Sequence, residues 1–96
     1  MTEEYTQGWK DGYEYAFGKC SLVKVCVNEN GEYSGEVVYN CSVKFDPKVY
    51  EKGPSYGNGF AEGMNSGRSA HVTELTKAYC EKNKIIYVDY SLKTKQ

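Results

Sequence analysis

The sequence predicts a small α+β domain in which a helix, a β-hairpin, a second helix and a last strand follow one another. Apolar residues recur at helical spacing near the N-terminus and again after residue 55, and they alternate with polar residues elsewhere. The 96 residues can bury one modest core, so we expect a single domain over residues 1–96. We expect a three-stranded sheet with both helices packed on one face.

The first helix is predicted over residues 3 to 19. Its apolar residues share one helical face that extends to Cys20, and they are Trp9, Tyr13, Ala16, Phe17 and Cys20. Gly8 and Gly12 each lower helicity by about 1 kcal/mol relative to Ala, so packing must hold this helix. Together with Ala16 they form a ridge of small residues, along which another backbone can approach closely.

A β-hairpin is expected next, with strands over residues 21 to 27 and 34 to 45. The turn is Asn28-Glu29-Asn30-Gly31, and an Asn-Gly tip favours a type I′ turn. That tip fixes a register with four pairs of opposed residues: Leu22 and Tyr39, Val23 and Val38, Val25 and Glu36, and Cys20 and Cys41.

The four cysteines do not form a C-x-x-C pair, and His71 is the only histidine, so the spacing does not indicate a zinc site. Opposed Cys20 and Cys41 could form a disulfide in an oxidising compartment, but we expect four free thiols. The sequence begins without a cationic leader and has no long apolar run, so we expect a cytoplasmic protein away from membranes, with no metal or cofactor.

Residues 47 to 55 have turn chemistry and are predicted to be a connecting loop. The second helix is expected from Tyr56 to Asn83, with a middle weakened by Gly63 and Gly67. Residues 85 to 92 alternate as a strand does and are predicted to be the third strand.

A shift of 51 residues aligns Tyr5-x-x-Gly8-Trp9-x-Asp11-Gly12 with Tyr56-x-x-Gly59-Phe60-x-Glu62-Gly63. At the same shift the strand residues Val37 to Asn40 fall on Val88 to Ser91. A diverged duplication of residues 5–46 and 56–92 is one interpretation, and a favourable helix-entry turn used twice is the other. Under the first, two glycine-ridged helices pack against each other or against copies across a dimer axis.

The net charge of −1 does not provide the positive field that nonspecific nucleic-acid binding needs, so nucleic acid is not an expected partner. Residues 1 to 46 sum to −4 and residues 47 to 96 to +3, a polarity compatible with head-to-tail self-association.

Tyrosine supplies ten of the fourteen aromatic residues, and surplus tyrosines are typical of protein interfaces. Tyr39, Tyr79 and Tyr90 fall on apolar faces and are expected in the core. The tyrosines without a core-facing pattern are the interface candidates: Tyr33, Tyr50, Tyr56 and Tyr87.

Two other kinds of site are open. The glycine-dense stretch with Gly57 and Gly59 opens a helix, where backbone N–H groups can hold a phosphate-bearing ligand with help from Arg68 and Lys52. A cysteine-dependent enzyme would need His71 as the base for a thiol, through tertiary packing that the sequence does not show.

The tyrosine-rich composition, lysine in excess over arginine and the repeated Tyr-x-x-Gly-aromatic-x-acid-Gly motif resemble small accessory proteins encoded by bacteriophages. The resemblance implies a viral inhibitor that acts in the host cytoplasm by occluding or sequestering a host factor, such as a defence component. We therefore expect a non-enzymatic, homodimeric protein-binding domain. The alternatives are a protein that sequesters a nucleotide-like signal and, third, the cysteine-dependent enzyme.

Overall fold

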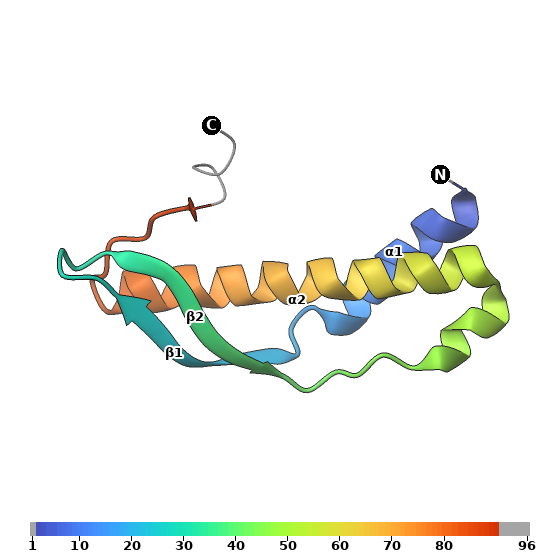
Figure 1. Ribbon diagram of the computed structural model, residues 1–96, viewed down its shortest axis with the longest axis horizontal. Coiled ribbons are helices and arrows are strands. Elements are labelled where there is room, and N and C mark those ends of the chain that lie inside the picture. The colour runs from blue at the N-terminus through green and yellow to red at the C-terminus, as the bar shows by residue number, and fades with distance from the viewer. Residues whose placement is uncertain (1, 91–96) are drawn as a thin grey trace.

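A computed structural model describes residues 2–90 (Figure 1). Helix α1 (Glu3–Ala16) leads into a hairpin of strands β1 (Cys20–Val27) and β2 (Tyr33–Cys41). A 3-10 helix, η1 (Pro47–Lys52), precedes the long helix α2 (Pro54–Lys82). In Figure 1, α1 lies along the N-terminal half of α2 and the hairpin along its C-terminal half, which gives an elongated molecule of 49 × 32 × 15 Å. The predicted α+β class and the order helix, hairpin, helix are confirmed.

The helix ends have local causes. The Thr2 hydroxyl accepts a hydrogen bond from the Tyr5 amide and caps α1, and Gly18 leaves the chain in a positive-φ conformation after the helix has ended at Ala16. Pro54 occupies the first turn of α2, where a missing N–H costs little, and α2 ends before Asn83 as predicted. The expected loop holds η1, which Asp46 caps.

The two helices run in the same direction and touch through glycine. A Cβ atom on Gly8 or Gly12 would overlap the carbonyl oxygen of Tyr56 or Phe60, and one on Gly63 would overlap that of Trp9. The missing side chains therefore let the two backbones meet, as the small-residue ridge predicts. Helix α2 is continuous through the middle that its glycines were expected to weaken, because α1 packs on those same residues.

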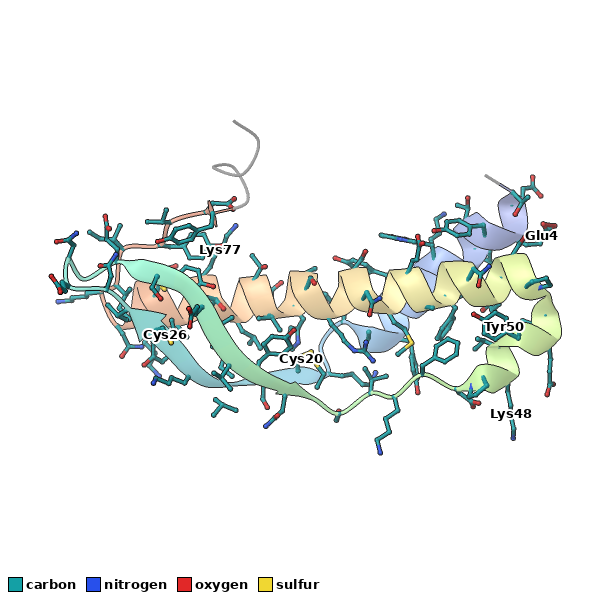
Figure 2. The ribbon with its side chains drawn as sticks, in the orientation of Figure 1. Glu4, Cys20, Cys26, Lys48, Tyr50 and Lys77 are labelled. Atoms are coloured by element: carbon teal, nitrogen blue, oxygen red, sulfur yellow. A yellow bond between two sulfur atoms is a disulfide. The ribbon has the colours of Figure 1, made fainter. Side chains whose placement is uncertain are left out.

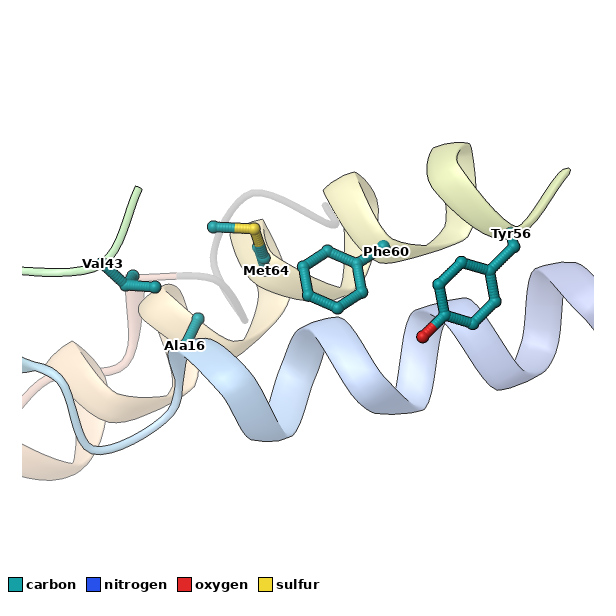
Figure 3. Close-up of a cluster of buried hydrophobic side chains, with 5 residues drawn as sticks. All are labelled: Ala16, Val43, Tyr56, Phe60 and Met64. Carbon is teal, nitrogen blue, oxygen red and sulfur yellow. The ribbon is translucent and has the colours of Figure 1, made fainter. Parts of the chain in front are cut away.

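The main core lies where α1, α2 and the chain after β2 meet, and Figure 3 shows its members: Ala16, Val43, Tyr56, Phe60 and Met64. Met64 is 1% exposed and Ala16 is fully buried. Val43 comes from the segment that leads from β2 to η1, so this segment, beyond the end of the sheet, closes the core.

The hairpin confirms two of the four expected pairs. Cys20 faces Cys41 and Leu22 faces Tyr39, but the register then shifts, so that Val38 faces Lys24 and Val25 faces Val37. The expected pairs of Val23 with Val38 and of Val25 with Glu36 are wrong, because an irregularity between Leu22 and Lys24 inserts one residue.

The turn also differs from the predicted type I′ geometry. Gly31 has a positive φ and Asn30 does not. The Asn28 side chain accepts hydrogen bonds from the Asn30 and Glu32 amides, at 2.9 and 3.0 Å, and so organises a longer loop.

The sheet has two strands, and the predicted third strand is wrong. Ile86 makes one isolated parallel bridge with Glu32, while Ser91 and Leu92 of the predicted strand lie outside the described residues. The Tyr90 hydroxyl donates to the Tyr33 carbonyl at 2.8 Å, so a side chain takes an acceptor on β2 that is needed for ladder pairing. Tyr87 stacks on the Tyr33 ring, with centroids 5.5 Å apart.

Cys20 and Cys41 form a disulfide at the base of the hairpin, where the pairing brings their Cα atoms within 4.0 Å (Figure 2). The expectation of four free thiols is therefore wrong for this pair and holds for Cys26 and Cys80. Disulfides persist mainly in oxidising compartments, so the bridge does not favour the expected cytoplasmic location. Within residues 2–90, neither helix combines the length and the apolar character that a membrane span requires.

Candidate binding surface

The contacts between α1 and α2 occur in equivalent pairs. When each residue of a contact is replaced by the residue 51 positions away, the result is another contact between the same two helices. Gly8 meets the Tyr56 backbone while Gly59 meets that of Tyr5. One helical turn further on, Gly12 meets Phe60 while Gly63 meets Trp9. The pair therefore has an approximate two-fold axis between two parallel helices. This axis runs parallel to the helices, so it places α1 on α2 and the front surface of the helix pair on its back surface. A residue of α1 on one surface therefore has an equivalent residue of α2 on the opposite surface.

The side-chain hydrogen bonds obey the same exchange. The Tyr56 hydroxyl donates to Asp11 at 2.5 Å, and the Tyr5 hydroxyl donates to Glu62. The hydrogen bond to Asp11, followed by burial, raises the pKa of Tyr56 to about 12. The hydrogen bond to Glu62 raises the pKa of Tyr5 above its usual value of 10.0. Each phenol thus ties its own helix to a carboxylate on the other.

One side of the helix pair is covered by the chain itself. The segment from Val43 through η1 packs on Tyr56 and Phe60, each of which is 8% exposed. The Phe45 ring lies against the Phe60 ring with centroids 6.4 Å apart. The Tyr50 ring rests on Gly57 so closely that a Cβ at that glycine would overlap it.

The equivalent side is open. Here five residues line a groove of about 460 Å³, which we call the Trp9 groove: Tyr5, Thr6, Trp9, Lys10 and Glu62. Trp9 is the counterpart of the buried Phe60, yet it is only half-buried. Thr6 is the counterpart of Gly57 and is exposed. Thr6 therefore carries a side chain at the position where the covered side has only Gly57 beneath the Tyr50 ring, so the two sides differ here.

An aromatic row extends the groove along α1. Trp9 stacks with Tyr13 at 5.3 Å between ring centroids, Tyr13 with Phe17 at 5.8 Å, and Phe17 contacts His71 at 5.1 Å. All four side chains are half-buried. A row of stacked rings with one side open is rigid and apolar, which is the composition of strong contact points in protein interfaces.

The residues predicted for binding fall into two places. Near the start of α2, Tyr50 is 42% exposed and donates to Asn58 at 3.0 Å, whereas Tyr56 is buried. Gly57 lies under the Tyr50 ring, and Gly59 packs on the α1 backbone. The density of glycine at this helix start is thus explained by packing.

Arg68 lies further along α2. Its guanidinium donates to the Asn65 side chain at 3.1 Å and to the Val43 carbonyl at 3.3 Å. It therefore holds the covering segment in position.

Tyr33 and Tyr87 lie at the other end, beside the hairpin turn, where their rings stack on each other. Tyr33 is 9% exposed, and the ammonium of Lys77 lies over the Tyr87 ring at 5.5 Å. The structure does not bring these two tyrosines together with Tyr50 and Tyr56. Tyr39 and Tyr79, which were expected in the core, are 43% and 41% exposed.

His71 and the cysteines have structural contacts. His71 accepts a hydrogen bond at Nδ1 from the Cys20 amide at 3.1 Å, and Cys20 is bonded to Cys41. Cys80 is 1% exposed, and burial raises the pKa of its thiol. Across the part of the chain that the structure describes, His, Cys, Asp and Glu side chains do not gather in a group that could hold a metal ion.

Sequence reasoning assigned Trp9, Tyr13 and Phe17 to a core-facing stripe and so did not identify the groove. The signal that could have found it is the repeat itself. Trp9 and Phe60 lie on equivalent aromatic faces, and each face would need an apolar segment packed on it to be buried. The segment from Val43 to Tyr50 can bury only one of the two faces.

A scan against protein-family models and searches of curated proteins and of solved structures each return no match for this chain.

Proposed function

We propose that the protein is a non-enzymatic binding domain that occludes or sequesters a partner protein through the Trp9 groove and the aromatic row. One observation carries the proposal: of two equivalent sides of one helix pair, one is buried under the chain's own residues and the other leaves Trp9 half-exposed above a groove of about 460 Å³. Exposed contiguous apolar surface on a small protein is typical of interaction sites.

The composition of the surface supports a protein partner. Its centre is aromatic, and Lys10 and Glu62 supply charge at the rim of the groove. An apolar centre within a polar rim is the usual anatomy of a protein interface, and Trp and Tyr are the residues most often essential there.

The test is partner capture by matched variants. Immobilised wild type, Thr6→Arg and Ala78→Arg are exposed to a bacterial lysate, since the resemblance to bacteriophage proteins makes host factors the first class to screen. Thr6 is exposed and lines the groove, whereas Ala78 is an exposed residue near the far end of α2. We expect wild type and Ala78→Arg to retain the same specific partner and Thr6→Arg to lose it.

Circular dichroism and thermal melting establish that both variants fold. If all three folded proteins capture the same set in the same amounts, binding through this surface is excluded.

A further inference from the structure

We propose that the Cys20–Cys41 disulfide is a site of thiol exchange in the folded protein, at which a small anionic thiol attacks the Cys41 sulfur. The inference goes beyond the proposed function and does not rest on it. It rests on where the bridge lies in the fold, on the unequal burial of its two cysteines and on the contacts that hold the strands around it.

The bridge lies in a surface hollow of about 380 Å³ at the base of the hairpin. Both cysteines line this hollow, together with residues that are small or polar: Gly18, Lys19, Ser21, Asn40 and Ser42. Within the described part of the chain, this lining lacks the aliphatic and aromatic side chains that bury the main core. A thiol can therefore reach the bridge while the protein stays folded, and exposed disulfides are the labile ones.

The two cysteines of the bridge are not equivalent. Cys20 is 9% exposed, and its amide donates to His71 Nδ1 at 3.1 Å, so this residue is packed against α2. Cys41 is half-buried and is the last residue of β2, where the chain leaves the sheet. The Cys41 sulfur is therefore the atom that an incoming thiolate attacks, and the Cys20 sulfur is the leaving group.

The exchange is a substitution at sulfur. The thiolate forms a bond to the Cys41 sulfur as the bond to Cys20 breaks, and the electron pair leaves with the Cys20 sulfur, which then takes a proton from water. A second thiolate attacks the sulfur that the first thiol brought and releases Cys41 as a thiolate, which is protonated in turn. Two thiols are thus oxidised to one disulfide, and the bridge is reduced by two electrons.

Contacts on both sides of the bridge hold the two cysteines close together when the bond between them is open. On one side the Ser42 amide donates to the Lys19 carbonyl at 2.9 Å. On the other side Ser21 pairs with Asn40 in the ladder between β1 and β2. The strands therefore remain paired without the covalent bond, and an oxidised thiol can restore it by the reverse reaction.

The charge of the hollow favours an anionic thiol. Among the described residues that line it, Lys19 is the one with a charged side chain. A hydrogen bond to the Tyr15 carbonyl at 2.9 Å fixes the position of its ammonium. A positive charge near a disulfide raises the local concentration of thiolates, most of all of thiols that carry a second negative charge.

The probe is 2-mercaptoethanesulfonate, a small anionic thiol, and mass spectrometry follows its reaction with the folded wild type. We expect a reduction rate that is proportional to the thiol concentration and changes little in urea below the unfolding transition, because the attack does not require unfolding. In samples quenched early with acid, the first adduct should lie on Cys41. A rate that rises as steeply with urea as global unfolding does, or a first adduct on Cys20, overturns the proposal.

Two charge-reversal variants, both checked for folding by circular dichroism, test the role of Lys19. Lys24→Glu makes the same change of net charge as Lys19→Glu at an exposed position further along β1. We expect Lys19→Glu to slow reduction by 2-mercaptoethanesulfonate about threefold at low ionic strength, and to slow reduction by uncharged 2-mercaptoethanol less. Lys24→Glu should follow the wild type. Equal rates of all three proteins with the anionic thiol would exclude the anionic reactant that the proposal names.

Discussion

Gly12 and Gly63 determine how close the two helices can be. Each faces a carbonyl of the opposite helix at a distance that leaves no room for a methyl group. In an exposed helix a change from Gly to Ala stabilises by about 1 kcal/mol, because Ala is the better helix former. At Gly12 and Gly63 the gain in helix propensity is opposed by the free-energy cost of moving the two helices apart to make room for the added methyl group.

We expect Gly12→Ala and Gly63→Ala each to lower the free energy of unfolding by about 1–3 kcal/mol, the usual cost of overpacking. Ser69→Ala, at an exposed position on α2, should change it by less than about 0.5 kcal/mol. Urea denaturation followed by circular dichroism measures all three. A stabilised Gly12→Ala protein would show that the helices are further apart than the structure has them.

The hydrogen-bonded phenols make stability depend on alkaline pH. Tyr56 keeps its proton in the folded protein up to a pKa of about 12, whereas the unfolded chain releases it near 10.0. Because the folded pKa is raised, the stabilisation is complete below pH 10 and is lost as the pH rises toward 12. Tyr5, whose pKa is also raised, acts in the same direction.

We therefore expect the melting temperature of the wild type to fall between pH 10 and 12, and to fall less steeply in Tyr56→Phe. Tyr79→Phe, at an exposed tyrosine, serves as the control and should follow the wild type. Parallel slopes for all three proteins would exclude a protonated Tyr56 as a source of this dependence.

The environment of some residues could be predicted from the sequence, and that of others could not. The small-residue ridge of Gly8, Gly12 and Ala16 is visible in the sequence because its spacing is local. The burial of Tyr56 and its hydrogen bond to Asp11 could not be predicted, because they depend on the position of α1, and Asp11 lies 45 residues away in the sequence. Tyr50 was a candidate for an outer surface, and in the structure its ring covers Gly57.

The hairpin is held at its base by a covalent bond. The Cys20–Cys41 disulfide joins residues 21 apart in the sequence, which in the chain-entropy model contributes about 3 kcal/mol. The same end of the hairpin is tied to α2, since the Cys20 amide donates to His71. We therefore expect loss of the disulfide to weaken the contact between the hairpin and α2.

Replacing both bridged cysteines by serine should lower the free energy of unfolding by about 2–4 kcal/mol. Cys26→Ser is the matched control, because Cys26 is a free, half-buried thiol on the same hairpin. Denaturation of both variants with and without reductant tests this, since reductant should affect only proteins that keep the bridge. Equal stability of wild type with and without reductant contradicts the expectation.

The predicted elements succeeded where local periodicity governs and failed where long-range contacts do. The presence of both helices and both hairpin strands follows from their apolar patterns, but the first helix ends at Ala16 rather than at residue 19 and the second strand at Cys41 rather than at residue 45. The shift in register after Leu22 and the contacts of Tyr87 and Tyr90 in place of a third strand do not, because they depend on contacts between residues far apart in the sequence. The 3-10 helix η1 lies within the predicted loop, and its cap, Asp46, is a signal that the sequence does contain.

The helix pair has one side that the chain itself covers and one open side, and equivalent substitutions distinguish them. Phe60 and Trp9 occupy matching positions, but Phe60 is 8% exposed beneath Phe45 and Trp9 is half-exposed. Phe60→Ala should cost about 3–5 kcal/mol of stability. Trp9→Ala should cost about half of that, because less of its surface is buried on folding.

Thermal and urea denaturation of the two variants give the comparison. Equal losses would mean that the Trp9 side is as much a part of the core as the Phe60 side, and the groove would then be structural. The contrast could not be predicted from the repeat alone, since the sequence does not reveal on which of the two faces the single covering segment lies.

The parallel course of the helix pair sets how the protein must fold. Antiparallel helices can pair through a short turn, but here the glycine ridges meet only after about fifty residues of chain have closed on themselves. We therefore expect this largely helical domain to fold more slowly than helical hairpins of its size. An oxidised Cys20–Cys41 bridge shortens that closure to about thirty residues, which should accelerate folding about twofold. We therefore expect the Cys20–Cys41 disulfide to serve folding as well as stability, because it shortens the loop that must close before the two helices can meet.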